Sequence, residues 1–279
     1  MPTPTSGTHS KLPAITLAYW IMKIAATTLG ETLGDFLSKG PEHGGINLGY
    51  ALASLIVLGI FLATLIPQLF TTRHIPFLYW AVILSTSTAG TTMSDFMDRT
   101  LGLGYAKGSA ILIAALIGAL VLWRLVEGSI SVSSVRTRRA ESFYWFAILC
   151  SNTLGTALGD YLADEEQGPG LGFMGGAALI GGVIAAIAAI YFIARKMKLT
   201  SPALCVGLFW AAFVLTRPFG ATFGDVLARP TSEGGLGFGP GGASAVLAAI
   251  LVGMIVFTKK RSRTQTATPG IGPSAESSR

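Results

Sequence analysis

Charge is scarce in this sequence. Lys, Arg, Asp and Glu make up only 12% of the 279 residues, whereas 51% are hydrophobic, and an average soluble domain carries about twice that share of charge. This balance excludes an ordinary soluble domain and predicts an integral membrane protein, whose partner is the lipid bilayer. The formal net charge of +6 does not indicate nucleic-acid binding, because the basic residues stand in short connections between apolar runs.

Cysteine and histidine are also rare. Cys150 and Cys205 lie inside apolar runs without the spacing of a metal or redox site, so we expect them to be small packing residues. His9, His43 and His74 stand outside the apolar runs. We therefore expect no zinc, copper or haem site and no cofactor. The N-terminus lacks the charged region and cleavage site of a signal peptide, so the first apolar run is expected to be retained.

Apolar runs long enough to cross a bilayer occur eight times. They fall at about 12–37, 46–70, 76–97, 103–126, 142–162, 170–194, 202–227 and 236–257. The sequence therefore predicts an all-α integral membrane protein with eight transmembrane helices.

One motif occurs four times without a gap, as GETLGDFL, GTTMSDFM, GTALGDYL and GATFGDVL at 30–37, 90–97, 155–162 and 220–227. A Trp preceded by an aromatic residue stands fifteen residues before each motif Asp, and the glycine of a Leu-Gly-aromatic sequence follows each Asp by nine to fourteen residues. Because each unit holds two spans, consecutive units start on the same side, and the sequence predicts four parallel two-helix repeats.

The repeats set the expected boundaries. We expect an N-terminal segment at 1–11, repeats at 12–70, 76–126, 141–194 and 202–257, a polar linker at 127–140 and a disordered tail at 258–279. Lys and Arg are concentrated in the linker, in the other connections between repeats and in the tail. The positive-inside rule therefore places both termini in the cytoplasm of a multi-pass protein of the inner (plasma) membrane, with net acidic loops outside.

The repeated Asp residues are the main functional candidates. Fifteen helical residues rise about 22 Å, so a Trp near the cytoplasmic side places each Asp near the outer boundary. Buried like charges need a bound cation, a proton or a paired base, and oxygen ligands suit hard cations such as Na⁺, Ca²⁺, Mg²⁺ or Mn²⁺. The expected cation or metal site contains Asp35, Asp95, Asp160, Asp225 and Glu31, with hydroxyl oxygens from Thr28, Thr88 and Thr153.

Three further groups of residues have expected roles. The small residues of each motif form small-xxx-small faces for close helix packing: Gly30, Gly34, Gly90, Gly155, Gly159, Gly220 and Gly224. Arg217 lies deep in a span beside Pro218, and we expect a counter-charge or hinge there, with Asp225 or Glu31 as the acid that pairs with Arg217. Lys23 is expected to extend toward the cytoplasmic interface.

The repeated unit resembles one family and shares ligand chemistry with another. Over nearly its whole length the chain resembles an uncharacterised family of bacterial multi-pass, membrane-anchored proteins that share T-x-G-x-x-x-G-D units, a resemblance that implies the fold alone. The sequence Glu31-Thr32-Leu33-Gly34-Asp35 is more faintly similar to the E-x-G-D-[KR]-[ST] motif of calcium/manganese exchange-type transporters. Here it has one extra residue, and the other units lack the Glu.

These residues leave several functions open. The leading hypothesis is a carrier of a small inorganic cation, which is not an enzyme. A channel with an outer ring of Asp is the first alternative, and an intramembrane aspartyl protease is the second, although G-x-x-x-G-D differs from the protease motif G-x-G-D. A structural or sensory role also remains open, and the sequence does not indicate the oligomeric state.

Overall fold

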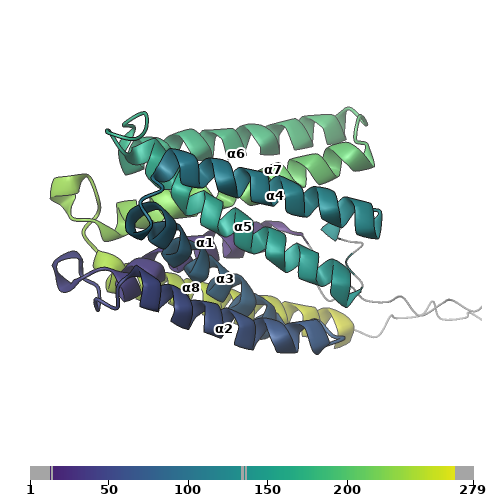
Figure 1. The fold of residues 1–279 in the computed structure, drawn as a ribbon. Helices are drawn as coiled ribbons and strands as arrows, with labels where there is room; N and C mark the ends of the chain where they lie inside the picture. The colour runs from purple at the N-terminus through teal and green to yellow at the C-terminus, as the bar shows by residue number, and fades with distance from the viewer. Residues whose placement is uncertain (1–12, 14, 133–134, 136, 268–279) are drawn as a thin grey trace, which may run out of the picture.

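The computed structural model describes residue 13, residues 15–132, residue 135 and residues 137–267, with side chains as far as Lys259. This part of the chain forms eight α-helices and no strand, which confirms the all-α prediction (Figure 1). The helices are α1 (Leu17–Ser38), α2 (Tyr50–Phe70), α3 (Pro76–Asp95), α4 (Tyr105–Glu127), α5 (Arg138–Ala163), α6 (Gly172–Lys196), α7 (Pro202–Ala228) and α8 (Gly239–Ala267). A π-helical turn, η2 (Phe96–Thr100), continues α3, and the 3₁₀ turns η1 (Pro41–His43) and η4 (Thr231–Glu233) follow α1 and α7.

The first helix of each repeat, the inner helix, belongs to a closed ring. Helix α1 packs against α3, α3 against α5, α5 against α7, and α7 against α1. The second helix of each repeat packs outside this ring, mainly on the inner helix of the next repeat: α2 on α3, α4 on α5, α6 on α7 and α8 on α1. The four repeats therefore interlock in a circle.

Motif glycines let the inner helices approach closely. A Cβ atom on Gly90 would lie 2.8 Å from the backbone of Asn152 in α5, and one on Gly34 would lie 2.7 Å from Thr91 in α3. Gly155 meets α7 in the same way, and Gly220 meets α1. These glycines therefore sit at each contact of the ring, as expected for small-xxx-small faces. The three remaining packing residues, Gly30, Gly159 and Gly224, also face the neighbouring inner helix.

The starts of the inner helices are capped by side chains. Thr16, Thr137 and Ser201 accept hydrogen bonds from the backbone N–H three residues later, at the starts of α1, α5 and α7. Such bonds satisfy donors that a helix start leaves free. Helix α3 begins instead with Pro76, a residue preorganised for the first helical position.

The repeated Leu-Gly-aromatic sequence has a backbone cause. Its glycine lies at the start of each outer helix with a positive φ: 72° at Gly49, 72° at Gly104, 64° at Gly172 and 75° at Gly237. Residues with a Cβ atom adopt this region at a cost, whereas glycine does not. The motif therefore fixes the turn that leads each chain segment from the ring into its outer helix.

Five of the eight helices are long and apolar enough to cross a membrane: α2, α4, α6, α7 and α8. The chain is thus a multi-pass membrane protein, while eight spans are more than this criterion finds. The difference has a physical reason, because α1, α3 and α5 carry polar residues that the ring buries, among them Lys23, Thr86 and Asn152. The outer helices instead expose large apolar side chains, such as Leu55, Ile117 and Ile190, on their outer faces.

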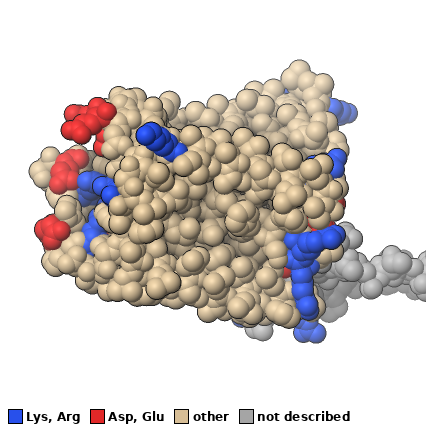
Figure 2. Space-filling model, viewed as in Figure 1, with Lys and Arg blue, Asp and Glu red and all other residues tan. Residues whose placement is uncertain are grey.

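Exposed charge is divided between the two ends of the bundle. The loops that follow the inner helices gather at one end, on the left in Figure 1, which we call the Asp end because the motif Asp residues lie toward it. The exposed acids Glu42, Glu165 and Glu233 belong to these loops. Figure 2 shows acidic side chains at this end with basic ones beside them, and a larger basic group at the opposite end.

Two expected boundaries differ from the structure. The tail predicted to be disordered from 258 is helical as far as Ala267, because α8 continues through it, and 268–279 lies outside the described residues. The linker is shorter than predicted, since α4 ends at Glu127 and α5 begins at Arg138. The expected N-terminal segment 1–11 lies outside the described residues as well.

Candidate functional site on the axis of the ring

Six positions spaced four residues apart line the axis of the ring. In the first repeat they are Tyr19, Lys23, Thr27, Glu31, Asp35 and Lys39. Residues four apart share one face of a helix, and the motif alignment supplies the equivalent residues of α3, α5 and α7. The side chains form stacked layers, and we name each layer after its residue in the first repeat.

Arg217 occupies the centre of the Thr27 layer, which also contains Ser87 and Asn152. Its side chain is fully buried. Its guanidinium donates to the backbone carbonyls of the other three members of the layer: Nε to Asn152 at 3.1 Å, Nη1 to Thr27 at 2.8 Å and Nη2 to Ser87 at 3.0 Å. One arginine therefore joins all four inner helices.

The Glu31 layer lies one turn nearer the Asp end and also contains Thr91, Thr156 and Ala221. The hydroxyls of Thr91 and Thr156 each donate to Glu31 Oε2 at 3.0 Å, and Arg217 Nη2 lies 3.3 Å from the same oxygen. Arg217 Nη2 also donates to both threonine hydroxyls. The acid that pairs with Arg217 is therefore Glu31, one of the two that the sequence indicated.

The four motif Asp residues form the next layer, and each is ion-paired. Three pair with the base four residues later: Lys39 Nζ lies 2.6 Å from Asp35, Arg99 Nε 2.7 Å from Asp95, and Arg229 Nε 3.0 Å from Asp225. The third repeat has Asp164 at that position. Asp160 pairs instead with Arg99 Nη2 at 3.4 Å, so one arginine serves two carboxylates.

The three bases are held by these acids although they lie at the edge of the ring. Burial disfavours the charged form of Lys39, but the nearby carboxylates, above all Asp35, raise its pKa above the usual value. The same balance of burial against the paired Asp raises the pKa of Arg99 and of Arg229. All three bases therefore stay charged at neutral pH and neutralise most of the Asp layer.

A cavity of about 620 Å³ opens at the Asp end between the first and fourth repeats. It is lined by Asp35, Lys39 and Arg229 from the two layers nearest the Asp end, and by Glu42, His43 and Glu233 nearer the surface. A smaller cavity of about 120 Å³ lies beside Asp225 and Arg229. Two of the paired carboxylates, Asp35 and Asp225, are therefore reachable from outside the bundle.

Among the described residues, the three threonines expected as ligands make no hydrogen bond to the axis carboxylates. Thr88 and Thr153 donate to carbonyls of their own helices, those of Leu84 and Leu149, at 3.0 Å each, and the buried Thr28 hydroxyl has no partner among the described residues. The hydroxyls that contact the axis acid Glu31 belong instead to Thr91 and Thr156, four residues before Asp95 and Asp160.

Pro218 does not interrupt its helix. Helix α7 runs without a break from Pro202 to Ala228, and the Pro218 carbonyl accepts a hydrogen bond from Thr222 Oγ1 at 2.9 Å. The Pro218 backbone lies against Gly155 of α5. In this conformation Arg217 acts as the counter-charge, and the proline is part of the packed contact between α5 and α7.

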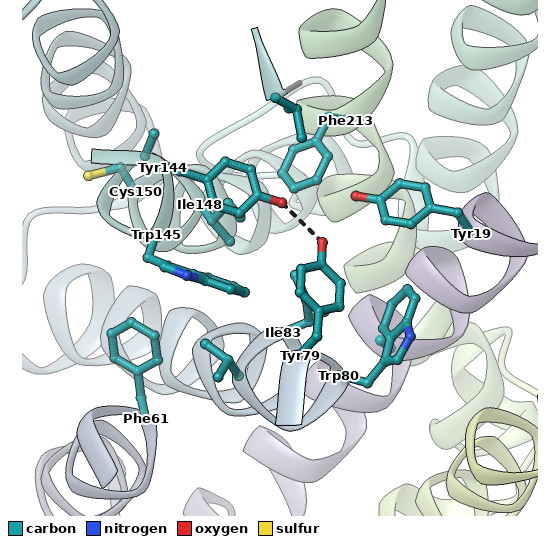
Figure 3. Packing of buried hydrophobic residues seen from close by; sticks show 14 of the residues in the cluster. Tyr19, Phe61, Tyr79, Trp80, Ile83, Tyr144, Trp145, Ile148, Cys150 and Phe213 are labelled. Carbon is teal, nitrogen blue, oxygen red and sulfur yellow. Dashed lines mark hydrogen bonds between the residues drawn. The ribbon is translucent and has the colours of Figure 1, made fainter. Parts of the chain in front are cut away.

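The half of the axis away from the Asp end contains titratable residues that the sequence alone does not assign to a site. Lys23 was expected to reach the interface, but its side chain is fully buried and its Nζ lies 4.2 Å from the centre of the Phe213 ring. One turn further, the hydroxyls of Tyr79 and Tyr144 are 3.0 Å apart, and Tyr19 points toward them (Figure 3). The spacing of four residues that links Asp35, Asp95 and Asp225 to their bases also reaches Lys23 and the three tyrosines when it is continued along each inner helix, so this spacing is the sequence signal for them.

Among the described residues, no group of three His, Cys, Asp or Glu side chains is arranged to hold a metal ion.

A family model described as "Repeat of Unknown Function (DUF347)" matches the chain four times, at residues 18–74, 78–129, 143–197 and 208–264. No curated protein and no solved structure matches the chain. The four matches coincide with the four two-helix units.

Proposed function

Because the chain belongs to the DUF347 repeat family and its ring surrounds an axis of buried charge, we propose that it carries a small hard cation across the membrane. The observation that carries this proposal is the balance of charge on the axis. Five buried carboxylates, Glu31 and the four motif Asp, pair with four bases, namely Lys39, Arg99, Arg217 and Arg229. One negative charge remains among these paired residues. Lys23, the fifth buried base of the axis, balances it when protonated, and a bound cation balances it when Lys23 is neutral.

The cation approaches through the cavity at the Asp end, where Asp35 and Lys39 lie side by side. The Lys39 ammonium is a compact charge on a flexible stem, so a cation such as Na⁺, Mn²⁺, Ca²⁺ or Mg²⁺ can take its place against the carboxylate. One oxygen of Asp35, Oδ1, is buried and has no hydrogen-bond partner within the described part of the chain. It is available to a cation without the loss of an existing bond.

A carrier fits the axis better than an open channel. Arg217 and Glu31 close the centre of the ring through hydrogen bonds to three neighbouring helices, and the aromatic residues lie beyond them. A cation can pass only when this contact rearranges, which is the behaviour of a carrier. An aspartyl protease would need a pair of acids that share one proton, whereas each motif Asp here pairs with a base.

The proposal includes eight spans, with both termini in the cytoplasm and the Asp end outside. The support is the basic group at the end opposite the Asp end and the acidic loops at the Asp end. Single cysteines introduced at Glu42, Glu165 or Glu233, in a chain without Cys150 and Cys205, should react with an impermeant thiol reagent outside the cell. A cysteine at Arg138 should not react, and the reverse pattern would reject this orientation.

The test of transport uses the purified protein in vesicles and a panel of radioactive Na⁺, Mn²⁺, Ca²⁺ and Mg²⁺. Asp35→Asn keeps the shape of the side chain and removes its charge, so we expect it to abolish the saturable flux seen with the wild-type protein. Glu165→Gln is the matched control, because Glu165 is exposed at the same end and outside the ring. Equal flux through both variants would remove Asp35 from the proposed site.

A further inference from the structure

Lys23 is a buried base without a hydrogen-bonded partner in the described part of the chain. Its side chain is fully buried, and its Nζ faces the Phe213 ring at 4.2 Å. The three equivalent residues of its layer, Ile83, Ile148 and Phe213, are apolar. An ammonium in the apolar interior of a membrane protein is costly without a partner, and such residues mark ion or proton pathways.

The charged and titratable groups around Lys23 lie on two sides. Toward the Asp end are Arg217 of α7 and, on its own helix, Glu31. Toward the opposite end are Tyr19 on its own helix, Tyr79 of α3 and Tyr144 of α5. Helix α8 has no titratable residue from Gly239 to Thr258, and the one titratable residue of α2, Tyr50, lies at the Asp end.

Charge competition connects these groups. Lys23 and Arg217 are both basic, while Glu31 is the one acid that pairs with either of them among the described residues. A cation bound at Glu31 or in the Asp layer adds positive charge to the same stretch of the axis. Like charges disfavour one another in a medium of low dielectric constant. Of these groups, the arginine guanidinium keeps its proton, whereas the lysine ammonium can release one and become a neutral amine.

We propose that Lys23 is the proton-carrying residue that couples cation movement to proton movement in the opposite direction. This inference rests on the proposed function. When a cation enters the carboxylate layers from the Asp end, one N–H bond of the Lys23 ammonium breaks, and the proton leaves to the solvent at that same end. When the cation has left at the opposite end, the amine takes up a proton from that end through the hydroxyls of Tyr144 and Tyr79. One monovalent cation and one proton then exchange without net charge movement.

The tyrosine pair provides a chemically suitable route for the proton that Lys23 takes up. A hydroxyl can donate one hydrogen bond and accept others, and the Tyr79 and Tyr144 hydroxyls are already bonded at 3.0 Å. Their layer adjoins the Lys23 layer on each inner helix, one helical turn away. Tyr19 points into the same space (Figure 3).

The experiment separates cation exchange from proton movement in vesicles that contain the full chain. Exchange of a labelled cation against the same cation, without a pH gradient, reports on the carboxylate site alone. A pH-sensitive dye inside the vesicles reports on protons moved by a cation gradient. For Lys23→Met we expect cation exchange within about threefold of wild type and a loss of at least about tenfold in coupled proton movement. Ile83→Met, at the equivalent position of α3, is the matched control and should retain both.

Two outcomes would overturn the inference. Proton coupling that survives in Lys23→Met excludes Lys23 as the proton carrier and leaves cation transport intact, while absence of cation exchange in the wild-type protein rejects the transport proposal itself. A second measurement does not depend on the methionine variant. Cation binding to the detergent-solubilised wild-type protein should release about one proton into a weak buffer, and Lys23→Arg should release none, because a guanidinium keeps its proton. Wild-type binding without proton release contradicts the inference.

Discussion

Arg217 Nη2 lies 3.3 Å from Glu31 Oε2 at the centre of the ring, and both side chains are almost entirely excluded from solvent. The two residues are the main departures from the repeat, since no other unit has an acid at the position of Glu31 or a base at the position of Arg217. The first and fourth units have therefore diverged in complementary ways. The charge that one unit brings onto the axis is balanced by the other across the contact between α1 and α7.

This pair predicts an asymmetric response to mutation. Arg217→Gln removes the hydrogen bonds to three helices and leaves Glu31 as an unpaired buried charge, so we expect a loss of stability of about 3–5 kcal/mol. Glu31→Gln in the same chain removes that charge, and the double variant should be more stable than Arg217→Gln alone. Thermal unfolding in detergent measures both. If Arg217→Gln unfolds at the wild-type temperature, the arginine does not hold the ring together.

The motif glycines give a second prediction about the ring. Gly90→Ala would place its Cβ atom 2.8 Å from the Asn152 backbone, which cannot move without displacing α5, so we expect a loss of about 1–3 kcal/mol. Gly59→Ala is the control, because Gly59 lies within α2 and a Cβ atom added there would meet no other atom within 4 Å. Because alanine favours a helix more than glycine does, Gly59→Ala should be neutral or stabilising by up to about 1 kcal/mol. Equal thermal stabilities of the two variants would contradict the close contact of α3 with α5.

Removal of a base that pairs with the motif Asp residues should change the affinity for the cation. Arg99→Gln frees both Asp95 and Asp160, whereas Lys39→Gln frees Asp35 alone. If the carboxylates bind the cation, both variants should bind it more tightly than wild type, and Arg99→Gln should show the larger gain. Titration calorimetry with the transported cation measures the affinities, and Arg138→Gln, at the opposite end, is the control. Unchanged affinity in Arg99→Gln would mean that the freed carboxylates do not take part.

Asp98, in the turn after α3, predicts a dependence of stability on pH. Burial raises the pKa of its carboxyl group to about 6, against the smaller opposing effect of the Ser94 hydroxyl. The folded protein therefore holds this proton more firmly than the unfolded chain does, and this contribution to stability is complete below about pH 4 and lost as the pH rises to about 6. Asp98→Asn should remove this part of the pH dependence. Thermal unfolding from pH 4 to 7 measures it, and identical profiles for the variant and the wild type would exclude Asp98 as a source.

Much of the ring could be predicted from the sequence. The four Asp, the Trp fifteen residues before each of them and the glycine of each Leu-Gly-aromatic sequence recur because every repeat makes the same turn and the same close contacts. Glycine occupies positions 90 and 220 for the expected reason, since the neighbouring helix leaves no room for a side chain. The contact of Arg217 with Glu31 was also among the expected pairings, because a deep arginine needs an acid.

The remaining features depend on distances that a single sequence does not contain. Lys39, Arg99 and Arg229 each stand four residues after an Asp, a spacing that brings side chains together on one helical face, yet the bridge from Arg99 to Asp160 requires the packing of α3 on α5. Thr88 and Thr153, seven residues before an Asp, bond to carbonyls of their own helices, whereas Thr91 and Thr156, four residues before an Asp, bond to Glu31 of another helix. Which hydroxyl finds a partner depends on how the inner helices pack. Lys23 could not be placed before the ring was known, because its depth depends on all four inner helices.

The most direct measurement is the initial rate of cation uptake by vesicles that contain the purified wild-type chain, compared with protein-free vesicles, for Na⁺, Mn²⁺, Ca²⁺ and Mg²⁺ over a range of concentrations. The account predicts uptake of at least one of these cations that saturates with concentration and is lost in Glu31→Gln, because Glu31 is the deepest carboxylate of the axis. Uptake no faster than that of protein-free vesicles for every cation would contradict it.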